Sequence, residues 1–306
     1  MRNTFSETLY QEATNSPDVC IVVADISPVG SMSEFSKNYP ERFINVGVAE
    51  QSMIAICAGL ALKGMQPFAY TIATFSLYRP FEMVRDDLCY QNLPVTVVGM
   101  GAGVIYSTLG STHHTQEDIA IAGALPNMQI IAPCDPLETI ESVKYCTRQK
   151  KGPVYLRLGK AGEPTFTENA DPWEFGKIRY TRKGSDVCIL TYGVIISLAD
   201  KIAQNLDDKG KKPSLVSCHT LKPLDTEGIV KVLQNYSLVI VIEEHAPQGG
   251  LGAQVKQIAW DHQAKCLLQT FSLKDDFIHN YGSRESLLEA HGLSEKLIMS
   301  EIQKLL

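Results

Sequence analysis

Short apolar runs alternate with longer segments of helical spacing along the first half of the chain. Six runs rich in β-branched residues have the composition of buried strands, and they cover residues 19–24, 43–48, 67–71, 95–100, 129–133 and 154–158. The segments between them place apolar residues at a helical period, over residues 50–63, 76–91, 116–124 and 136–149. This alternation predicts a mostly parallel sheet covered by helices on both faces.

The pattern breaks over residues 159–184, where glycine, proline and polar residues replace the apolar runs. Such a composition is typical of a connection between domains. The alternation then resumes, with strand-like runs at 186–193, 214–221, 237–245 and 266–273 and helical patterns near 195–207, 225–235, 250–262 and 284–305. We therefore predict an α/β fold of two domains, each a mostly parallel sheet flanked by helices: residues 1–165, a linker at 166–184, and residues 185–306.

Composition and charge exclude several classes of protein. The net charge of −6 gives no basic surface for nucleic acid or for an anionic membrane. No apolar run approaches the ~18 residues of a membrane span, and the N-terminal segment 1–16 lacks the apolar core of a signal peptide. None of the eight cysteines forms a C-x-x-C pair, and most lie in apolar segments. We expect free thiols in a reducing cytoplasm.

Glu50 is the first candidate for chemistry, because it lies between a short apolar run and a long apolar helix. An acid at this place is by itself typical of a first helical turn, where it complements the helix dipole. The following residues 52–64 are nearly all apolar, so the helix is expected to be buried and its beginning poorly solvated. A carboxylate in such a dry position is suited to hold a proton at a cofactor nitrogen.

The loop 101–118 is the second candidate, since it follows a strand and precedes a helix, where open α/β sheets bind ligands. It contains Tyr106 and two adjacent histidines, His113 and His114. An ordinary helix-capping loop is an equal alternative, because Thr115 and the acids after it would begin the next helix well. If the loop binds substrate, the two histidine side chains diverge, and only one faces the site.

Weaker signals surround these two. Most residues of the aromatic group between 68 and 81 are expected in the core, but Phe75 and Tyr78 flank a strand-to-helix turn and could pack on a planar ring. The run Glu243, Glu244 and His245 ends a predicted strand. It lacks further ligands at metal-binding spacing, so we expect no metal site there.

Motifs along nearly the whole chain resemble the C-terminal half of transketolases. They are ADISP (24–28), RFINVGVAEQ (42–51), TFSLYRPFE (74–82), GSTHHTQED (110–118), MQIIAPCDP (128–136), LKPLD (221–225) and EEHAPQGGLGAQV (243–255). The GVAEQ and THH motifs in this order are the specific ones. Pyruvate dehydrogenase β-type subunits and deoxyxylulose phosphate synthase share the architecture that the resemblance implies, a pyrimidine-binding domain followed by a small C-terminal domain.

The resemblance implies a thiamine diphosphate site. Glu50 would contact N1′ of the aminopyrimidine, Phe75 and Tyr78 would pack on that ring, and Asp25 would lie near the cofactor. His113 would hydrogen-bond the substrate oxygens and assist proton transfer.

His114 and Arg157 are further expected substrate ligands, with Lys160 as a neighbouring candidate for a sugar phosphate. The chain departs from the family where Tyr106 replaces a histidine and Leu109 replaces an acid that reads a sugar hydroxyl. These departures leave the sugar open.

The G-D-G…N motif that holds the diphosphate and Mg²⁺ in the family has no counterpart in this sequence. The resemblance therefore implies a β-type subunit of a split transketolase. An N-terminal partner subunit would hold most of the Mg²⁺ site, in an α2β2 assembly that transfers a two-carbon ketol unit from a ketose to an aldose. Two alternatives stay open: the β subunit of a 2-oxo acid dehydrogenase E1 component, and a non-catalytic regulatory or binding subunit.

Overall fold

A parallel sheet forms the centre of the first domain in the computed structural model, which describes residues 1–26 and 31–306. Within those residues its strands run in the order β10-β5-β6-β4-β3-β1-β2. Their bounds are β1 Val19–Val23, β2 Phe43–Asn45, β3 Gln66–Ile72, β4 Thr96–Met100, β5 Gln129–Ile131, β6 Val154–Leu158 and β10 Thr220–Lys222. Strands β1 to β6 pair in parallel, which confirms the predicted α/β architecture.

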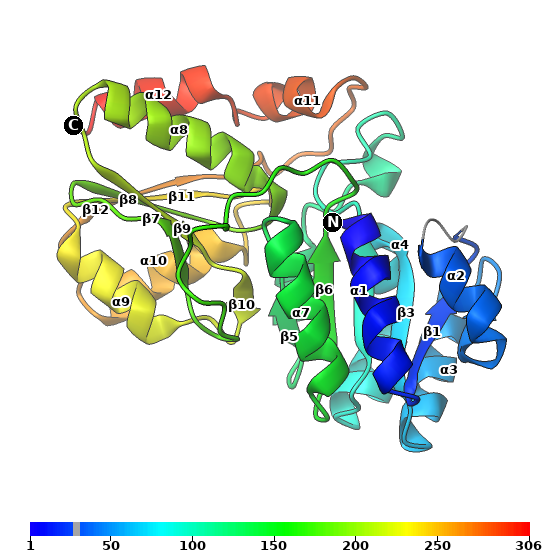
Figure 1. Cartoon of the computed structure of the whole chain (residues 1–306). Coiled ribbons are helices and arrows are strands. Elements are labelled where there is room, and N and C mark those ends of the chain that lie inside the picture. Colours follow the sequence, from blue (N-terminus) through cyan, green and yellow to red (C-terminus); the bar gives the residue numbers. More distant parts are fainter. Residues whose placement is uncertain (27–30) are drawn as a thin grey trace.

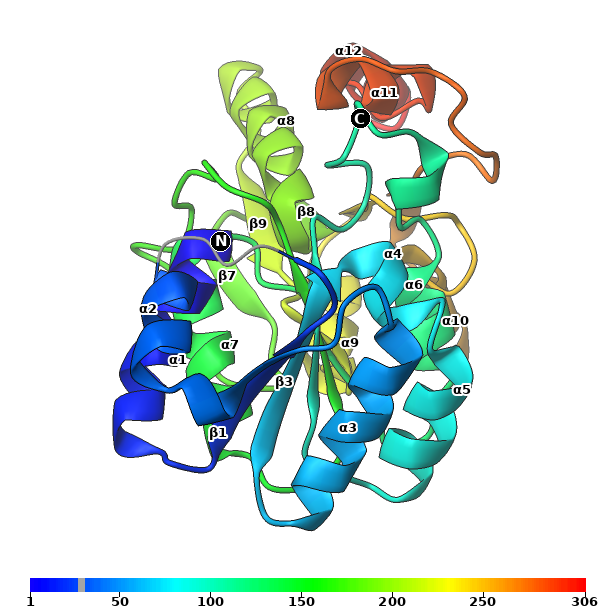
Figure 2. The same cartoon turned by 90° about the vertical axis from the view of Figure 1, so that its right-hand side faces the viewer.

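Helices cover both faces of this sheet, as Figures 1 and 2 show. One face carries α1 Arg2–Asn15, α2 Ser31–Asn38 and α7 Pro136–Arg148. The other face carries α3 Glu50–Leu62, α4 Ala73–Leu77, α5 Phe81–Met83 and α6 Asp118–Gly123, together with the π-helical turn η2 Val84–Tyr90. The single helix expected over 76–91 is thus divided. Pro80 lacks the N–H that a continuous helix needs, and α5 begins after it.

The second domain is a smaller α/β unit. Its described strands run in the order β12-β11-β8-β9-β7. The strands are β7 Arg179–Arg182, β8 Val187–Thr191, β9 Pro213–Ser217, β11 Leu238–Ile242 and β12 Leu267–Phe271. The helices are α8 Ile196–Asp208, α9 Thr226–Asn235, α10 Leu251–Asp261, α11 Arg284–Ala290 and α12 Glu295–Gln303, with a 3-10 turn η4 Gly193–Ile195 before α8. Each of these helices, like those of the first domain, is too short or too polar to cross a bilayer.

Two segments differ from the expected pattern at the domain boundary. Strand β7 lies inside the expected linker 166–184 and pairs antiparallel with β9, so the second sheet begins before residue 185. The run 214–221 divides between both domains, because β9 joins the second sheet while β10 pairs antiparallel with β5 of the first. Lys222 fixes β10 there by donating to the carbonyls of Gly123 and Leu125, at 2.7 and 2.6 Å.

The C-terminal segment also departs from the single helix expected over 284–305. Helix α11 ends before Gly292, which has a φ of +86° that side chains other than glycine rarely adopt. Helix α12 then begins with a cap in which the Ser294 hydroxyl accepts from the Leu297 N–H. The eight cysteines are free, and all except Cys266 are buried, as expected from their apolar surroundings.

The linker packs on both domains through aromatic rings. Trp173 stacks on His219 with ring centroids 4.9 Å apart, and Phe175 stacks on Tyr145 at 4.2 Å. Burial, with the charge of Arg179 as a smaller cause, lowers the pKa of His219 to about 3. His219 is therefore neutral in the folded chain over the whole physiological range.

His219 should make the stability of the chain depend on pH. Its pKa is about 6.5 in an unfolded chain and about 3 in the fold, so between these values only the unfolded state binds the proton. Stability is then lost as the pH falls below 6.5, and from pH 7 to pH 5 the loss from this residue is about 2 kcal/mol. Denaturant unfolding at both pH values should show this loss shrinking in His219→Phe, which keeps an aromatic ring against Trp173. Equal pH dependence in both proteins would contradict the assignment.

Candidate functional site

Glu50 begins helix α3 and is buried, with 6% of its surface exposed. The parallel strands β1 and β2 end side by side just before it, with Val23 opposite Asn45. The Asn45 side chain accepts from the backbone N–H groups of Asp25 and Gly47, at 3.2 and 3.0 Å. These bonds fix the turn that leads into α3, and they place exposed Asp25 on the same edge of the sheet. Ser27 and Pro28 of the ADISP motif lie outside the described residues.

Arg79 is the direct partner of Glu50. Its Nη1 donates to Glu50 Oε1 at 2.8 Å, and its guanidinium lies 4.0 Å from the centre of the Phe75 ring. The Phe75 ring in turn meets the His113 ring edge-on, with centroids 5.2 Å apart. The structure therefore brings three of the predicted residues, Glu50, Phe75 and His113, into one continuous group. Arg79 was not among the expected site residues, although it lies four residues after Phe75, one helical turn away.

The two adjacent histidines point in different directions, as their consecutive positions require. His113 is half-buried beside Phe75, and its Nδ1 lies 3.0 Å from the Thr112 hydroxyl. His114 is buried, and neither of its ring nitrogens has a hydrogen-bond partner among the described residues. Burial lowers the pKa of His114, so its imidazole is neutral at pH 7. Only His113 therefore presents its ring to the group around Glu50.

Tyr78 is held by the start of helix α6. Its hydroxyl donates to Glu117 Oε2 at 2.9 Å and accepts from the Glu117 N–H at 3.3 Å. Burial raises the pKa of Tyr78 far above its usual value, so the hydroxyl stays protonated. The packing of the Tyr78 ring on a cofactor ring stays a prediction, because the contacts described here involve only the hydroxyl group.

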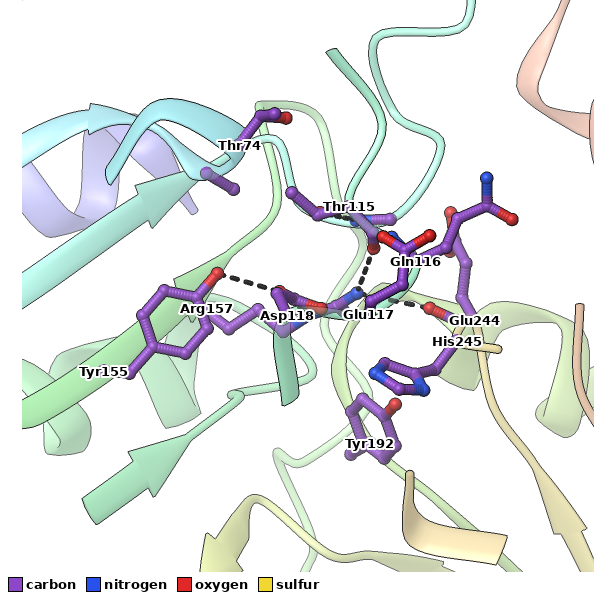
Figure 3. Close-up of polar contacts among 12 residues, drawn as sticks. Thr74, Thr115, Gln116, Glu117, Asp118, Tyr155, Arg157, Tyr192, Glu244 and His245 are labelled. Carbon is purple, nitrogen blue, oxygen red and sulfur yellow. Dashed lines mark hydrogen bonds and ion pairs between the residues drawn. The ribbon is translucent and has the colours of Figure 1, made fainter. Parts of the chain in front are cut away.

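Arg157 occupies a buried position that does not suit the substrate ligand expected from the sequence. It is 3% exposed, and its Nε donates to Asp118 Oδ2 at 2.8 Å, where the Tyr155 hydroxyl also donates at 2.8 Å (Figure 3). Its Nη2 donates to the carbonyls of Thr115 and Glu244, at 3.4 and 3.2 Å. Arg157 thus connects strand β6, the second domain and the loop 101–118 that carries His113 and His114, which we call the histidine loop. We assign it a structural role in place of the expected substrate contact.

Lys160 keeps a more open position than Arg157. Its ammonium lies 5.1 Å from the centre of the Tyr106 ring. Lys160, Ile105 and Arg284 are among the residues that line a cavity of about 330 Å³ between the histidine loop and the second domain. A cation at this place suits an anionic substrate group better than the buried guanidinium of Arg157.

The chemistry of the site fits one half of thiamine diphosphate. A buried carboxylate can bond an aminopyrimidine and an aromatic ring can pack on it, and Glu50 and Phe75, which are connected through Arg79, supply these two groups. The described residues contain no cluster of three His, Cys, Asp or Glu side chains that could hold a metal ion. The fit that these residues support is therefore to the pyrimidine.

Replacing Arg157 should test its structural role. Arg157→Met leaves the Asp118 carboxylate buried and unpaired, so the free energy of unfolding should fall by about 3–5 kcal/mol. The control is Arg85→Met, which breaks an ion pair with Asp86 whose two side chains are 61% and 49% exposed and should cost less than ~1 kcal/mol. Chemical denaturation measures both. An Arg157→Met chain as stable as the wild type would restore Arg157 as a candidate substrate ligand.

Comparisons with known proteins match nearly the whole chain. The family model for the transketolase pyrimidine-binding domain matches residues 1–162, and that for the transketolase C-terminal domain matches residues 176–298. A subunit of the apulose-4-phosphate transketolase of Actinobacillus succinogenes is 32% identical over 98% of this chain and 96% of its own length. A putative transketolase C-terminal section of Methanocaldococcus jannaschii is 33% identical over 99% of this chain and 96% of its own length.

A solved structure gives the same result in three dimensions. A split gene transketolase, described as an inactive beta4 tetramer, superposes with a TM-score of 0.87 and 32% identity, covering 99% of this chain and 96% of that one. Both family models match this chain, and relatives of nearly equal length carry the same family name. The chain therefore belongs to the transketolase family.

Proposed function

We propose that this chain is the C-terminal, β-type subunit of a split, thiamine diphosphate-dependent transketolase. It would transfer a two-carbon ketol unit from a ketose, or its phosphate, to an aldose with an N-terminal partner subunit. The observation that carries this proposal is the continuous group of Glu50, Phe75 and His113 at the edge of the first sheet. Relatives of the same length that are named as subunits or C-terminal sections of transketolases support it.

Each residue of the group has a distinct task in this proposal. When bound, the cofactor would supply the nucleophilic carbon for chemistry at a ketose carbonyl. The Glu50 carboxyl forms the hydrogen bond at N1′ of the aminopyrimidine, and Phe75 packs on that ring. His113 donates to a substrate oxygen and moves a proton there. His114 and Lys160 are proposed neighbours of the substrate.

Arg79 adds a requirement that the sequence did not suggest. In the free chain its guanidinium donates to Glu50 Oε1, so it would compete with the pyrimidine for this carboxylate. The Arg79 side chain is 47% exposed, whereas that of Glu50 is 7% exposed. Arg79 can therefore move into solvent, provided that the bound cofactor gives the buried Glu50 carboxylate a new hydrogen-bond partner.

We expect a second, different chain in the complete site, because Glu50 and Phe75 account for the pyrimidine half of the cofactor. Mg²⁺ and the diphosphate would be held mainly by the N-terminal subunit, in an α2β2 assembly. One relative is named as a single subunit of its transketolase, and another was observed as an inactive beta4 tetramer. Both descriptions support a β chain that needs a different partner for activity.

Reconstitution tests the proposal. The isolated chain with thiamine diphosphate and Mg²⁺ should show no tight binding in calorimetry and no turnover of ketose donors. Adding the N-terminal subunit should create both properties, since the diphosphate site is then complete. Micromolar binding by this chain alone, or a complex that binds the cofactor and transfers no ketol unit, would overturn the proposal.

Glu50→Gln should separate binding from chemistry in that complex. The amide keeps the size of the side chain but removes the titrating proton, so we expect a loss of at least ~10²-fold in kcat. Proton exchange at cofactor C2, followed by NMR, should slow in parallel. Glu227→Gln is the matched control, because Glu227 is an exposed acid in the first turn of α9. Unchanged C2 exchange in Glu50→Gln would reduce Glu50 to an acid that complements a helix dipole.

A further inference from the structure

The acidic run at the end of strand β11 takes no part in the chemistry proposed above. Glu243, Glu244 and His245 are all buried. Glu243 serves its own domain, because it accepts from the N–H groups of Leu251 and Gly252 at the start of α10, at 2.7 and 2.9 Å. The neighbouring Glu244 makes contacts of a different kind.

Glu244 reaches out of the second domain to the base of the histidine loop. Its Oε1 accepts from the Val104 N–H at 2.7 Å, and the carboxylate is 1% exposed. Arg284, the first residue of α11, is its counter-ion. Gly103 permits this approach, because a Cβ there would lie 2.5 Å from Glu244 Oε1. The carboxylate and the loop are therefore fitted to one another.

The same part of the second domain also holds the far end of the loop. The Ala246 N–H donates to the Gln116 carbonyl at 2.7 Å. The Glu244 carbonyl accepts from Arg157, which also donates to the Thr115 carbonyl, as Figure 3 shows. Thr115 closes the loop by pairing with Gly103, through a backbone bond of 2.9 Å and a hydroxyl bond of 2.7 Å. Both ends of the segment 103–116 are thus fixed on residues 244–246.

His113 lies on the part of the loop that these contacts leave between them. One further contact to the second domain supports it, where the Ser111 hydroxyl donates to the Ile278 carbonyl. A hydrogen-bond donor is effective only when it is held near its productive geometry, and a displacement of 1 Å can cost ~10²-fold in rate. The Thr74 hydroxyl of the first domain also donates to the His114 carbonyl, at 3.3 Å, so the contacts that hold the loop around His113 come from both domains.

We propose that Glu244 is a positioning residue: from the C-terminal domain it fixes loop 103–116 and thereby aims His113 at the site around Glu50. Its effect on turnover rests on the proposed function, whereas its effect on the loop does not. Glu243 offers a matched control, because it is a carboxylate on the same strand end, equally buried, whose bonds stay inside the second domain.

Amide hydrogen exchange on the isolated full chain tests how firmly loop 103–116 is held, and it requires no catalytic activity. Glu244→Ala should raise amide exchange over 103–116 by at least ~10-fold, since local opening sets protection, and Glu244→Gln should restore most of the protection because its amide oxygen still accepts from Val104. Glu243→Gln should change exchange only at the start of α10. Unchanged loop exchange in Glu244→Ala would overturn the proposal.

Kinetics of the reconstituted complex test whether the contact of Glu244 with the loop affects turnover through His113. We expect kcat/KM to fall ~10–100-fold in Glu244→Ala, with C2 exchange of the cofactor unchanged because Glu50 is untouched. Adding Glu244→Ala to His113→Ala should cause no further loss, since residues that act through one another are not additive. Additive losses would overturn the link to His113. A wild-type complex without turnover would defeat the proposed function, and the exchange experiment would still decide the role of Glu244 in holding the loop.

Discussion

The buried ion pair between Arg157 and Asp118 is the interaction on which the rest of the site depends. It joins strand β6 to the start of helix α6, and Arg157 extends the connection to the carbonyls of Thr115 and Glu244. A buried pair of this kind contributes little net stability, because two ions must leave water to form it. Its value here is geometric: the planar guanidinium offers several donors in fixed directions, and each is directed at a different segment.

The histidine loop is the clearest product of this arrangement. A loop with several glycines has high conformational entropy, and fixing it costs free energy for every residue that is ordered. The structure offsets this cost with bonds from two domains, through Arg157 on one side and Glu244 with Ala246 on the other. The second domain is consequently part of the site even though it carries none of the groups assigned to proton transfer.

Local pattern was sufficient to predict the two α/β domains and most strands. The resemblance of short motifs to transketolases selected Glu50, Phe75 and His113, which the structure brings together. These features follow from apolar periodicity and from motifs of a few residues. The predictions that failed concern contacts between residues that are far apart in the sequence. Arg157 looked like a free cation because its partner Asp118 is 39 residues away, and β10 looked like part of β9 because its partner is β5 of the other domain. Arg79 was missed because its contact with Glu50 joins helix α3 to the turn between α4 and α5, which the sequence does not place side by side.

Strand β10 follows the second-domain strand β9 in the sequence but pairs in the first sheet, and this limits how the chain can be divided. Because β10 lies along β5, a fragment ending near residue 165 would lose the cover on that side of its sheet. The exposed edge of β5 would then offer unpaired N–H and C=O groups to other chains, which is a common route to aggregation. The pyrimidine-binding half is therefore a poor unit for separate expression or for domain shuffling. A usable cut must keep residues 220–222 with the first sheet, which in practice means keeping both domains together.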